Sequence, residues 1–267
     1  MKKYIYIVLL ATSTLFSSCE EVIDLNLDQH EKRVVIDANL FVDETDYNKI
    51  TLSYSAPFYA DGYQYISTAS VKITNTSTNE SYPFTYTSNG TYENSNFDPE
   101  TNATYELEVI VEGKTYRATS KVWQAPEIEK IEQVNDGGFT GDMKEVQFYY
   151  RDDANTEDYY LSQIKDSEEN DFFNGNDLFT NGNLMSDSYA AEDEQVGETI
   201  FYGLAKIDKD YYSYLSKLFS NAATAGNPFA TPTGTLKGNI INTTNENEFP
   251  LGYFHISKRS TTSYIIQ

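Results

Sequence analysis

Few residues of this chain could carry catalytic or zinc chemistry. The 267 residues include one cysteine, Cys19, and two histidines, His30 and His255. Tetrahedral zinc takes roughly three or four His, Cys or carboxylate ligands, and neither histidine has a cysteine or glutamate at a metal-ligand interval. A Ser-His-Asp triad would depend on the same two histidines, and there is no Gly-x-Ser-x-Gly elbow, phosphate loop or dinucleotide fingerprint. We therefore expect neither a zinc site nor one of these enzyme mechanisms.

Carboxylates are abundant, with 41 Asp and Glu residues, so a pair for general acid and base catalysis needs separate consideration. A glycosidase requires two carboxyl groups about 5–9 Å apart, one of them with a raised pKa. Asp152, Asp153 and Asp158 are the natural candidates, but they flank a polar turn in which water would screen them. We expect a solvated turn there, and a carboxylate-based hydrolase is the least favoured function.

One acidic and amide-rich segment could hold calcium, which takes roughly six to eight oxygen ligands from carboxylates, amides and the backbone. A second such segment, Asn135-Asp136, has the same kinds of atoms, and neither follows the order of an EF-hand. An ordinary polar loop would have the same composition, so a structural calcium ion is the only cofactor that we consider. The first segment supplies Asp171, Asn174, Asn176 and Asp177.

Aromatic residues beside Asp and Asn are typical of sugar-binding sites, where rings stack on the sugar and oxygens accept hydrogen bonds. Two segments have this composition, and the first is expected on a loop at one end of a sandwich, where recognition is often placed. Tyrosines also cover sheet edges and interfaces, where the ring buries area and the hydroxyl stays in water, so the alternative to a ligand or partner contact is an ordinary surface role. The candidate residues are Tyr59, Asp61, Tyr63, Tyr65, Phe172 and Phe173.

The N-terminus predicts export and lipidation. Residues 1–18 carry Lys2 and Lys3 before an apolar run, Tyr4–Leu10, that is shorter than the about 20 residues needed to span a bilayer. The run Leu15-Phe16-Ser17-Ser18-Cys19 resembles a bacterial lipobox, although Phe16 stands where leucine is commonest. We expect cleavage before Cys19 and acylation of its thiol, with more than one acyl chain needed for a stable anchor. The alternative is an ordinary leader with an incidental thiol.

Acidic residues follow the cysteine directly, at Glu20, Glu21 and Asp24. In Bacteroidota lipoproteins, acidic residues at this place resemble the signal for the outer face of the outer membrane. We therefore expect residues 19–32 to be a lipidated acidic tether and the protein to face the cell exterior. An anchor facing the periplasm is the alternative, since an acidic protein could begin this way by composition alone.

The overall charge argues against nucleic acid as a binding partner. The formal net charge is −22 at pH 7, without the basic stripe that nucleic-acid binding requires. With 15% aromatic residues, the chain is also unlike a disordered acidic tail. We expect a folded protein that binds no nucleic acid.

Short β-type runs separated by turn residues predict an all-β fold. Glu112-Gly113 joins two alternating runs and predicts a hairpin. We expect an immunoglobulin-like antiparallel β-sandwich over residues 33–123 and a second β-rich, sandwich-like module over residues 124–267. The second module would contain a long polar loop, 165–198, and one helix, 209–223, capped by Asp208. We place the closing strands, Leu236–Ile241 and Gly252–Ser257, in the second module.

Five segments carry a resemblance to a known family: Cys19–Leu25, Val34–Ala38, Ser53–Phe58, Leu236–Ile240 and Pro250–Phe254. In these segments the chain resembles the Bacteroidota outer-membrane lipoproteins grouped as domain of unknown function four-two-four-nine. Members are often encoded beside TonB-dependent receptors, so the resemblance implies an accessory role at the cell surface and no catalytic signature.

We therefore expect a lipid-anchored, surface-exposed, non-catalytic protein that works with a TonB-dependent receptor in ligand capture or uptake. A structural or adhesive surface protein without a transport partner is the main alternative. The sequence names neither the ligand nor the receptor.

Overall fold

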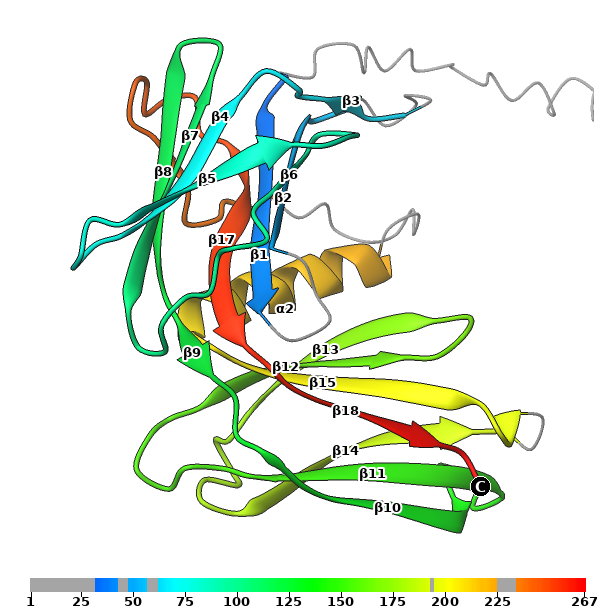
Figure 1. Cartoon of the computed structure of the whole chain (residues 1–267). Helices are drawn as coiled ribbons and strands as arrows, with labels where there is room; N and C mark the ends of the chain where they lie inside the picture. Colours follow the sequence, from blue (N-terminus) through cyan, green and yellow to red (C-terminus); the bar gives the residue numbers. More distant parts are fainter. Residues whose placement is uncertain (1–31, 43–47, 57–61, 193–194, 225–233) are drawn as a thin grey trace, which may run out of the picture.

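The computed structural model describes residues 32–42, 48–56, 62–192, 195–224 and 234–267. They form two β-sheet modules, one above the other, with the single described helix, α2 (Lys209–Thr224), lying between them (Figure 1). The predicted all-β class with one helix is confirmed.

The first module is a continuous path of strands that folds over on itself. The order is β16-β8-β7-β4-β5-β6-β2-β1-β17-β9, with β3 paired to β2. Strand β5 pairs with both β4 and β6, so it joins the two halves, and side chains from both halves share one core. The strands from the first half of the chain are β1 (Val34–Val42), β2 (Lys49–Tyr54), β3 (Gln64–Tyr65), β4 (Ser70–Asn75), β5 (Ser81–Tyr86), β6 (Thr91–Glu93), β7 (Thr104–Val111), β8 (Lys114–Lys121) and β9 (Trp123–Gln124).

The predicted hairpin at Glu112-Gly113 is present. Strands β7 and β8 pair from Val111 and Lys114 outward, which leaves a two-residue turn. Both turn residues have positive φ, 50° for Glu112 and 77° for Gly113. This is the turn whose twist matches that of the flanking strands.

The second module consists of two small sheets packed face to face, β10-β11-β14 and β13-β12-β15-β18. Their inner faces form a separate core, in which the Phe148 and Tyr202 rings stack with centroids 4.4 Å apart. The strands are β10 (Ile128–Gly137), β11 (Met143–Arg151), β12 (Tyr159–Lys165), β13 (Asn170–Asn176), β14 (Leu184–Ala191), β15 (Thr199–Ile207) and β18 (Ser260–Ile265).

The expected loop over residues 165–198 is wrong, because this segment contains β13 and β14. Each is the edge strand of its sheet. An edge strand with one face in water needs few apolar residues, and polar side chains protect such edges from pairing with other chains. The polar composition therefore concealed two strands.

The end of the chain does not stay in the second module, where we expected it. Strand β16 (Ile241–Asn242) pairs with β8, and β17 (Leu251–Lys258) lies between β1 and β9, parallel to both (Figure 1). Close contact with β1 depends on Gly252, which has φ of 101° and whose hypothetical Cβ would lie 2.0 Å from the Ile36 carbonyl oxygen. After Arg259 the chain crosses back to the second module as β18. Such a pairing, more than 200 residues apart in sequence, leaves no local signal.

Candidate functional site

The site begins with the outer face of β1. Alternation turns Ile36, Ala38 and Leu40 into the first core, so Asp37 and Asn39 point to the opposite face. The parallel register with β17 places Tyr253 beside Asp37 and His255 beside Asn39. A polar patch therefore forms in the middle of a sheet face.

Helix α2 lies over this face. It begins after Asp208, whose Oδ1 accepts a hydrogen bond of 2.8 Å from the Tyr211 backbone N–H, which makes Asp208 the N-cap. Tyr211 and Leu215, one turn apart, are the buried side chains of the helix. The Tyr211 ring stacks on His255, with centroids 4.4 Å apart. Leu161 and Ile207 of the second module join the same aromatic core, so α2 packs against both modules.

Two hollows of about 390 Å³ each flank α2, and they share Asp37, Asn39 and Leu215. We call them the β13 hollow and the β17 hollow, after the strand that borders each one. The β13 hollow is also lined by Phe41, Lys49, Thr51, Leu161, Phe172, Tyr211 and Phe219. The β17 hollow is also lined by Val35, Tyr214, Leu218, Thr235, Leu236, Leu251, Gly252 and Tyr253.

Asp37 is the carboxylate common to both hollows. It is accessible to water, yet protein surrounds it on most sides, and this desolvation raises its pKa above the usual value. The Asn39 Nδ2 donates a hydrogen bond of 2.6 Å to Asp37 Oδ1, which opposes the rise in pKa only in part. Burial and the nearby Asp37 charge also raise the pKa of Tyr214.

The polar groups beneath α2 are incompletely paired. His255 is fully buried, its nearest carboxylate oxygen is Asp208 Oδ2 at 3.7 Å from Nδ1, and neither ring nitrogen has a hydrogen-bond partner. Burial lowers the pKa of His255, so the ring is neutral at physiological pH. The neighbouring Asn39 Oδ1 is also buried and without a partner.

The composition of these groups is that of a recognition site. The histidine is shielded from solvent, and within the described ranges no group of three or more His, Cys, Asp or Glu side chains could hold a metal ion. A single accessible carboxylate among aromatic and aliphatic walls resembles a binding cleft, where a few polar groups orient the ligand.

The predicted aromatic candidates do not converge. Tyr63 and Tyr65 are exposed at β3, with ring centroids 6.3 Å apart, and they line neither hollow. Phe172 lines the β13 hollow, whereas Phe173, on the opposite face of β13, packs against the second core. Tyr59 and Asp61 lie outside the described residues.

The predicted calcium ligands are not gathered around one point. Asp171 is exposed, on the face of β13 opposite to Asn174 and Asn176. The amide nitrogens of those two donate to α2, Asn174 to Ser216 Oγ at 2.7 Å and Asn176 to the Tyr212 hydroxyl at 2.8 Å. Asp177 is buried, with one side-chain oxygen unpartnered. The two asparagines therefore dock α2 onto β13.

The predicted turn is exposed in its middle, where Asp153 lies, but the two carboxylates at its ends, Asp152 and Asp158, are buried. Asp152 and Asp158 are 4% and 2% exposed, and the Tyr160 hydroxyl lies 2.6 Å from Asp152 Oδ1 and 3.3 Å from Asp158 Oδ2. Lys206 Nζ pairs with Asp158 Oδ1 at 2.6 Å. Tyr160 of β12 bridges the two carboxylates, and Lys206 of β15 neutralises Asp158. We interpret these contacts as a structural network that fixes the turn to β12 and β15.

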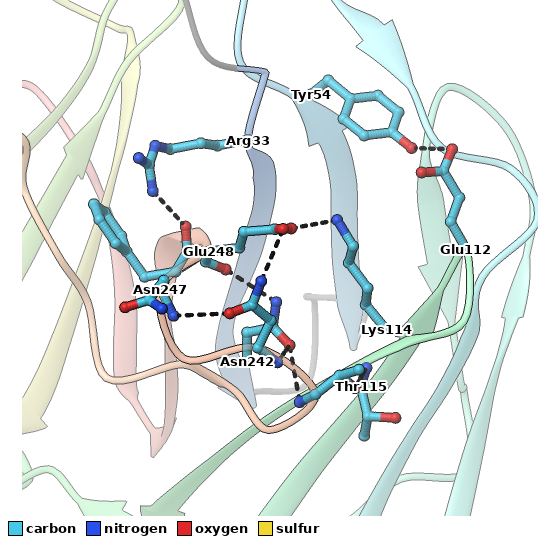
Figure 2. A network of polar contacts seen from close by, with 11 residues as sticks. Arg33, Tyr54, Glu112, Lys114, Thr115, Asn242, Asn247 and Glu248 are labelled. Atoms are coloured by element: carbon cyan, nitrogen blue, oxygen red, sulfur yellow. Dashed lines mark hydrogen bonds and ion pairs between the residues drawn. The ribbon is translucent and has the colours of Figure 1, made fainter.

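A second polar network fastens the returning C-terminal segment to the first module (Figure 2). Lys114 pairs with Glu248, and Arg33 Nη1 donates to the Phe249 carbonyl at 3.1 Å. The Asn242 side chain donates to the Glu248 carbonyl at 3.0 Å, and these contacts hold the segment between β16 and β17 against β8 and the start of β1. The adjoining hollow is only about 110 Å³. We interpret this network as structural: it fixes the segment between β16 and β17 to the first module.

The predicted anchor and export residues, Cys19, Glu20, Glu21 and Asp24, lie outside the described residues. Among the residues that the structure does describe, no helix is both long and apolar enough to cross a membrane.

Sequence reasoning missed Asp37, Asn39 and the α2 residues as parts of one site. Asp37 and Asn39 look like ordinary outward-facing strand residues in sequence, and only the return of β17 and the placement of α2 turn that face into a cleft. Tyr211 and Leu215 lie in the helix that the sequence predicts over residues 209–223, but no local signal assigns them to a site.

Comparison with known proteins gives a family and distant structural likenesses. A family model described as "Domain of unknown function (DUF4249)" matches residues 20–263. No curated protein matches the sequence. Similar solved structures include a cytokine receptor complex, at 9% identity and a TM-score of 0.26 over 67% of this chain and 86% of that chain. Another is the chicken interferon gamma receptor alpha chain, at 13% identity and a TM-score of 0.22 over 65% and 87%. A third contains the FN1-FN3 domains of chicken CNTN1, at 8% identity and a TM-score of 0.24 over 67% and 62%.

Proposed function

Because the chain belongs to the family described as "Domain of unknown function (DUF4249)", we propose that it is a non-catalytic binding protein anchored to the outer membrane. It would be held through lipid on Cys19, face the cell exterior, and work with a TonB-dependent receptor in capturing or importing a ligand. The resemblance on which this partner rests extends from the Cys19–Leu25 segment to Pro250–Phe254.

The observation that carries the binding role is the cleft along α2. Its hollows of about 390 Å³ lie in the size range of small-ligand sites. Their walls are aromatic and aliphatic, and Asp37 and Asn39 provide orienting polar groups on a rigid sheet face. The contacts that fix the segment between β16 and β17, and the packing of α2 against both modules, would hold these walls in place before a ligand binds.

The proposal is tested by affinity purification of the full chain, tagged at its C-terminus, from detergent-solubilised outer membranes of its native host. We expect a TonB-dependent receptor to co-purify. The matched control is Cys19→Ser, which leaves the described fold unchanged but removes the acylated thiol. This variant should be absent from the membrane fraction and recover no receptor.

Two results would count against the proposal. If intact protein from the membrane fraction carries an unmodified Cys19 thiol by mass spectrometry, the anchor is wrong. If the lipidated protein recovers no receptor, and deletion impairs surface attachment without affecting uptake, the adhesive alternative replaces the transport role.

A further inference from the structure

Asp37 has an unusual position for an unpaired carboxylate. It lies between Val35 and Asn39 on the outer face of β1, and α2 passes over this face. In the described part of the chain no lysine, arginine or histidine forms an ion pair with it, and its hydrogen bond comes from the neutral Asn39 amide. Among the described residues, the carboxylate therefore has no ion-pair partner that would neutralise its charge.

The β17 hollow concentrates this charge among apolar groups. Asp37 is the only Asp, Glu, Lys, Arg or His among the described residues that line it. The Tyr214 and Tyr253 rings lie 4.9 Å apart in its wall, and Leu218 is 40% exposed there. Further apolar lining comes from Leu236 and Leu251.

The β13 hollow differs in charge. Lys49 lines it and lies 3.9 Å from Glu93 Oε1, so that hollow already contains a cation. Asp37 lines both hollows. A positively charged ligand would be repelled by Lys49 in the β13 hollow, but the described residues that line the β17 hollow include no cation. The β17 hollow is accordingly the better place for such a ligand.

A carboxylate surrounded by tyrosine rings is suited to an organic cation. Ring faces attract cations with about 0.5–2 kcal/mol, and the carboxylate supplies a charge-assisted hydrogen bond. A neutral sugar would also stack on the rings and donate hydrogen bonds to the carboxylate, but only a cation would also compensate the charge of Asp37.

We propose that the β17 hollow binds a ligand that joins one amine or guanidine group to an apolar stem, with the cation on Asp37 and the stem against Leu218, Leu236 and Leu251. This proposal deepens the proposed function, since it names the ligand class of the same cleft. The group is present on free organic amines and on the side chains of lysine- or arginine-containing peptides.

The test measures binding of defined probes to the full chain by isothermal titration calorimetry at neutral pH. The free probes are 4-phenylbutylamine and its neutral counterpart 4-phenylbutanol. The peptide probes are a blocked lysine pentapeptide with phenylalanine on either side of the lysine, and the same peptide with the lysine acetylated. We expect each cation to bind about tenfold more tightly than its neutral counterpart. Tight binding of only one pair identifies the source as free or peptide-borne.

Two variants locate the effect. Asp37→Asn keeps the size of the side chain and should abolish the preference for the cation. Leu218→Ala should weaken both members of a pair equally, because it removes apolar contact and leaves the charge. The matched control Asp136→Asn removes an exposed carboxylate on β10 and should change neither. Thermal unfolding checks that each variant is folded.

The inference is overturned if the charged and neutral probes bind equally, if neither binds, or if Asp37→Asn retains the preference. Receptor co-purification does not depend on Asp37 in this scheme. A protein that recovers its receptor without cation selectivity overturns this inference alone, whereas failure to recover a receptor overturns the proposed partner.

Discussion

Asp37 shows, at the scale of a single residue, how a binding group can reduce stability. Asp37 is accessible to water, but the protein around it still raises its pKa, and the hydrogen bonds from Asn39 oppose this rise only in part. Asn39 and His255, its neighbours beneath α2, also keep buried polar atoms without partners. Each unsatisfied buried group costs about 1–3 kcal/mol. A face selected for stability alone would carry apolar residues here.

We therefore expect Asp37→Asn to stabilise the protein at neutral pH. The pKa of Asp37 is higher in the folded state than the value of 3.8 for an unstructured chain. Below pH 3.8 both states are protonated and the substitution should gain nothing. As pH rises through the interval up to the folded-state pKa, the wild type loses stability that the variant keeps. Urea unfolding from pH 3 to 8 measures this difference.

The matched comparison is Asp136→Asn, which changes an exposed carboxylate on β10 and should leave the unfolding midpoint at pH 7 unchanged. A variant at Asp37 that is less stable than the wild type at pH 7 would contradict the argument, since it would mean that the Asn39 hydrogen bond outweighs desolvation.

The residues of the site were only partly predictable from sequence. Phe172 was chosen for its aromatic ring next to Asp171 and Asn174, and it does line the cleft. Asp37 could not be chosen, because alternating polar residues on a strand are typical of a face in water. Burial of that face depends on β17 and α2, which are more than 150 residues away in sequence. The Tyr63 and Tyr65 prediction is neither supported nor excluded as a partner contact.

At the scale of elements, α2 was predicted well and β13 and β14 were not. The helix has a capping aspartate and apolar residues at helical spacing, which are local signals. The two strands have neither alternation of strongly apolar residues nor distinct turns, because each lies at a sheet edge with polar groups outward. Local sequence predicts elements that are stabilised by local interactions. Strands β13 and β14 are instead stabilised by pairing with β12 and β11, respectively.

The N-cap of α2 gives a prediction at this scale. Asp208→Ala should lower the free energy of unfolding by about 0.5–2 kcal/mol at pH 7, since it removes the acceptor for the Tyr211 N–H. Burial acts to raise the pKa of Asp208, but the nearby His255 and the backbone N–H groups bring it below the usual value. The carboxylate therefore contributes stability above pH 3.8, and this contribution is lost as pH falls through the folded-state pKa.

Urea unfolding of three proteins checks this prediction. Asp208→Asn retains a capping oxygen and should lose less stability than Asp208→Ala. Equal losses in both variants would assign the stabilisation to the charge beside His255 and contradict the capping role.

At the scale of the molecule, the two modules are not two independent segments of chain. The first sandwich takes β17 in between β1 and β9, where Phe254 and Ile256 are fully buried. Loss of such side chains from a core costs about 2–5 kcal/mol each. The chain leaves the first module near residue 124, which is the boundary that the sequence predicts. The first module is nevertheless incomplete without β17, which comes from the C-terminal part of the chain.

We expect a fragment of residues 32–125 to lack cooperative unfolding, as measured by circular dichroism during a urea titration. Adding residues 234–258 through a Gly/Ser linker of about fifteen residues should restore it, because a parallel connection needs about a dozen residues or more. The same fusion with Phe254→Asp should remain unfolded. Cooperative unfolding of residues 32–125 alone would contradict the requirement for β17.

The pairing of β17 with β1 also limits when the first module can fold during synthesis. A polypeptide emerges with its N-terminus first, so β1 must wait for almost all later residues before its neighbour arrives. Until then the sheet edge of β1 is open, and pairings this remote in sequence form slowly. The incompletely folded protein would therefore expose an unpaired strand edge until its last residues are made, and a chain that ends before residue 258 could not complete its first sandwich.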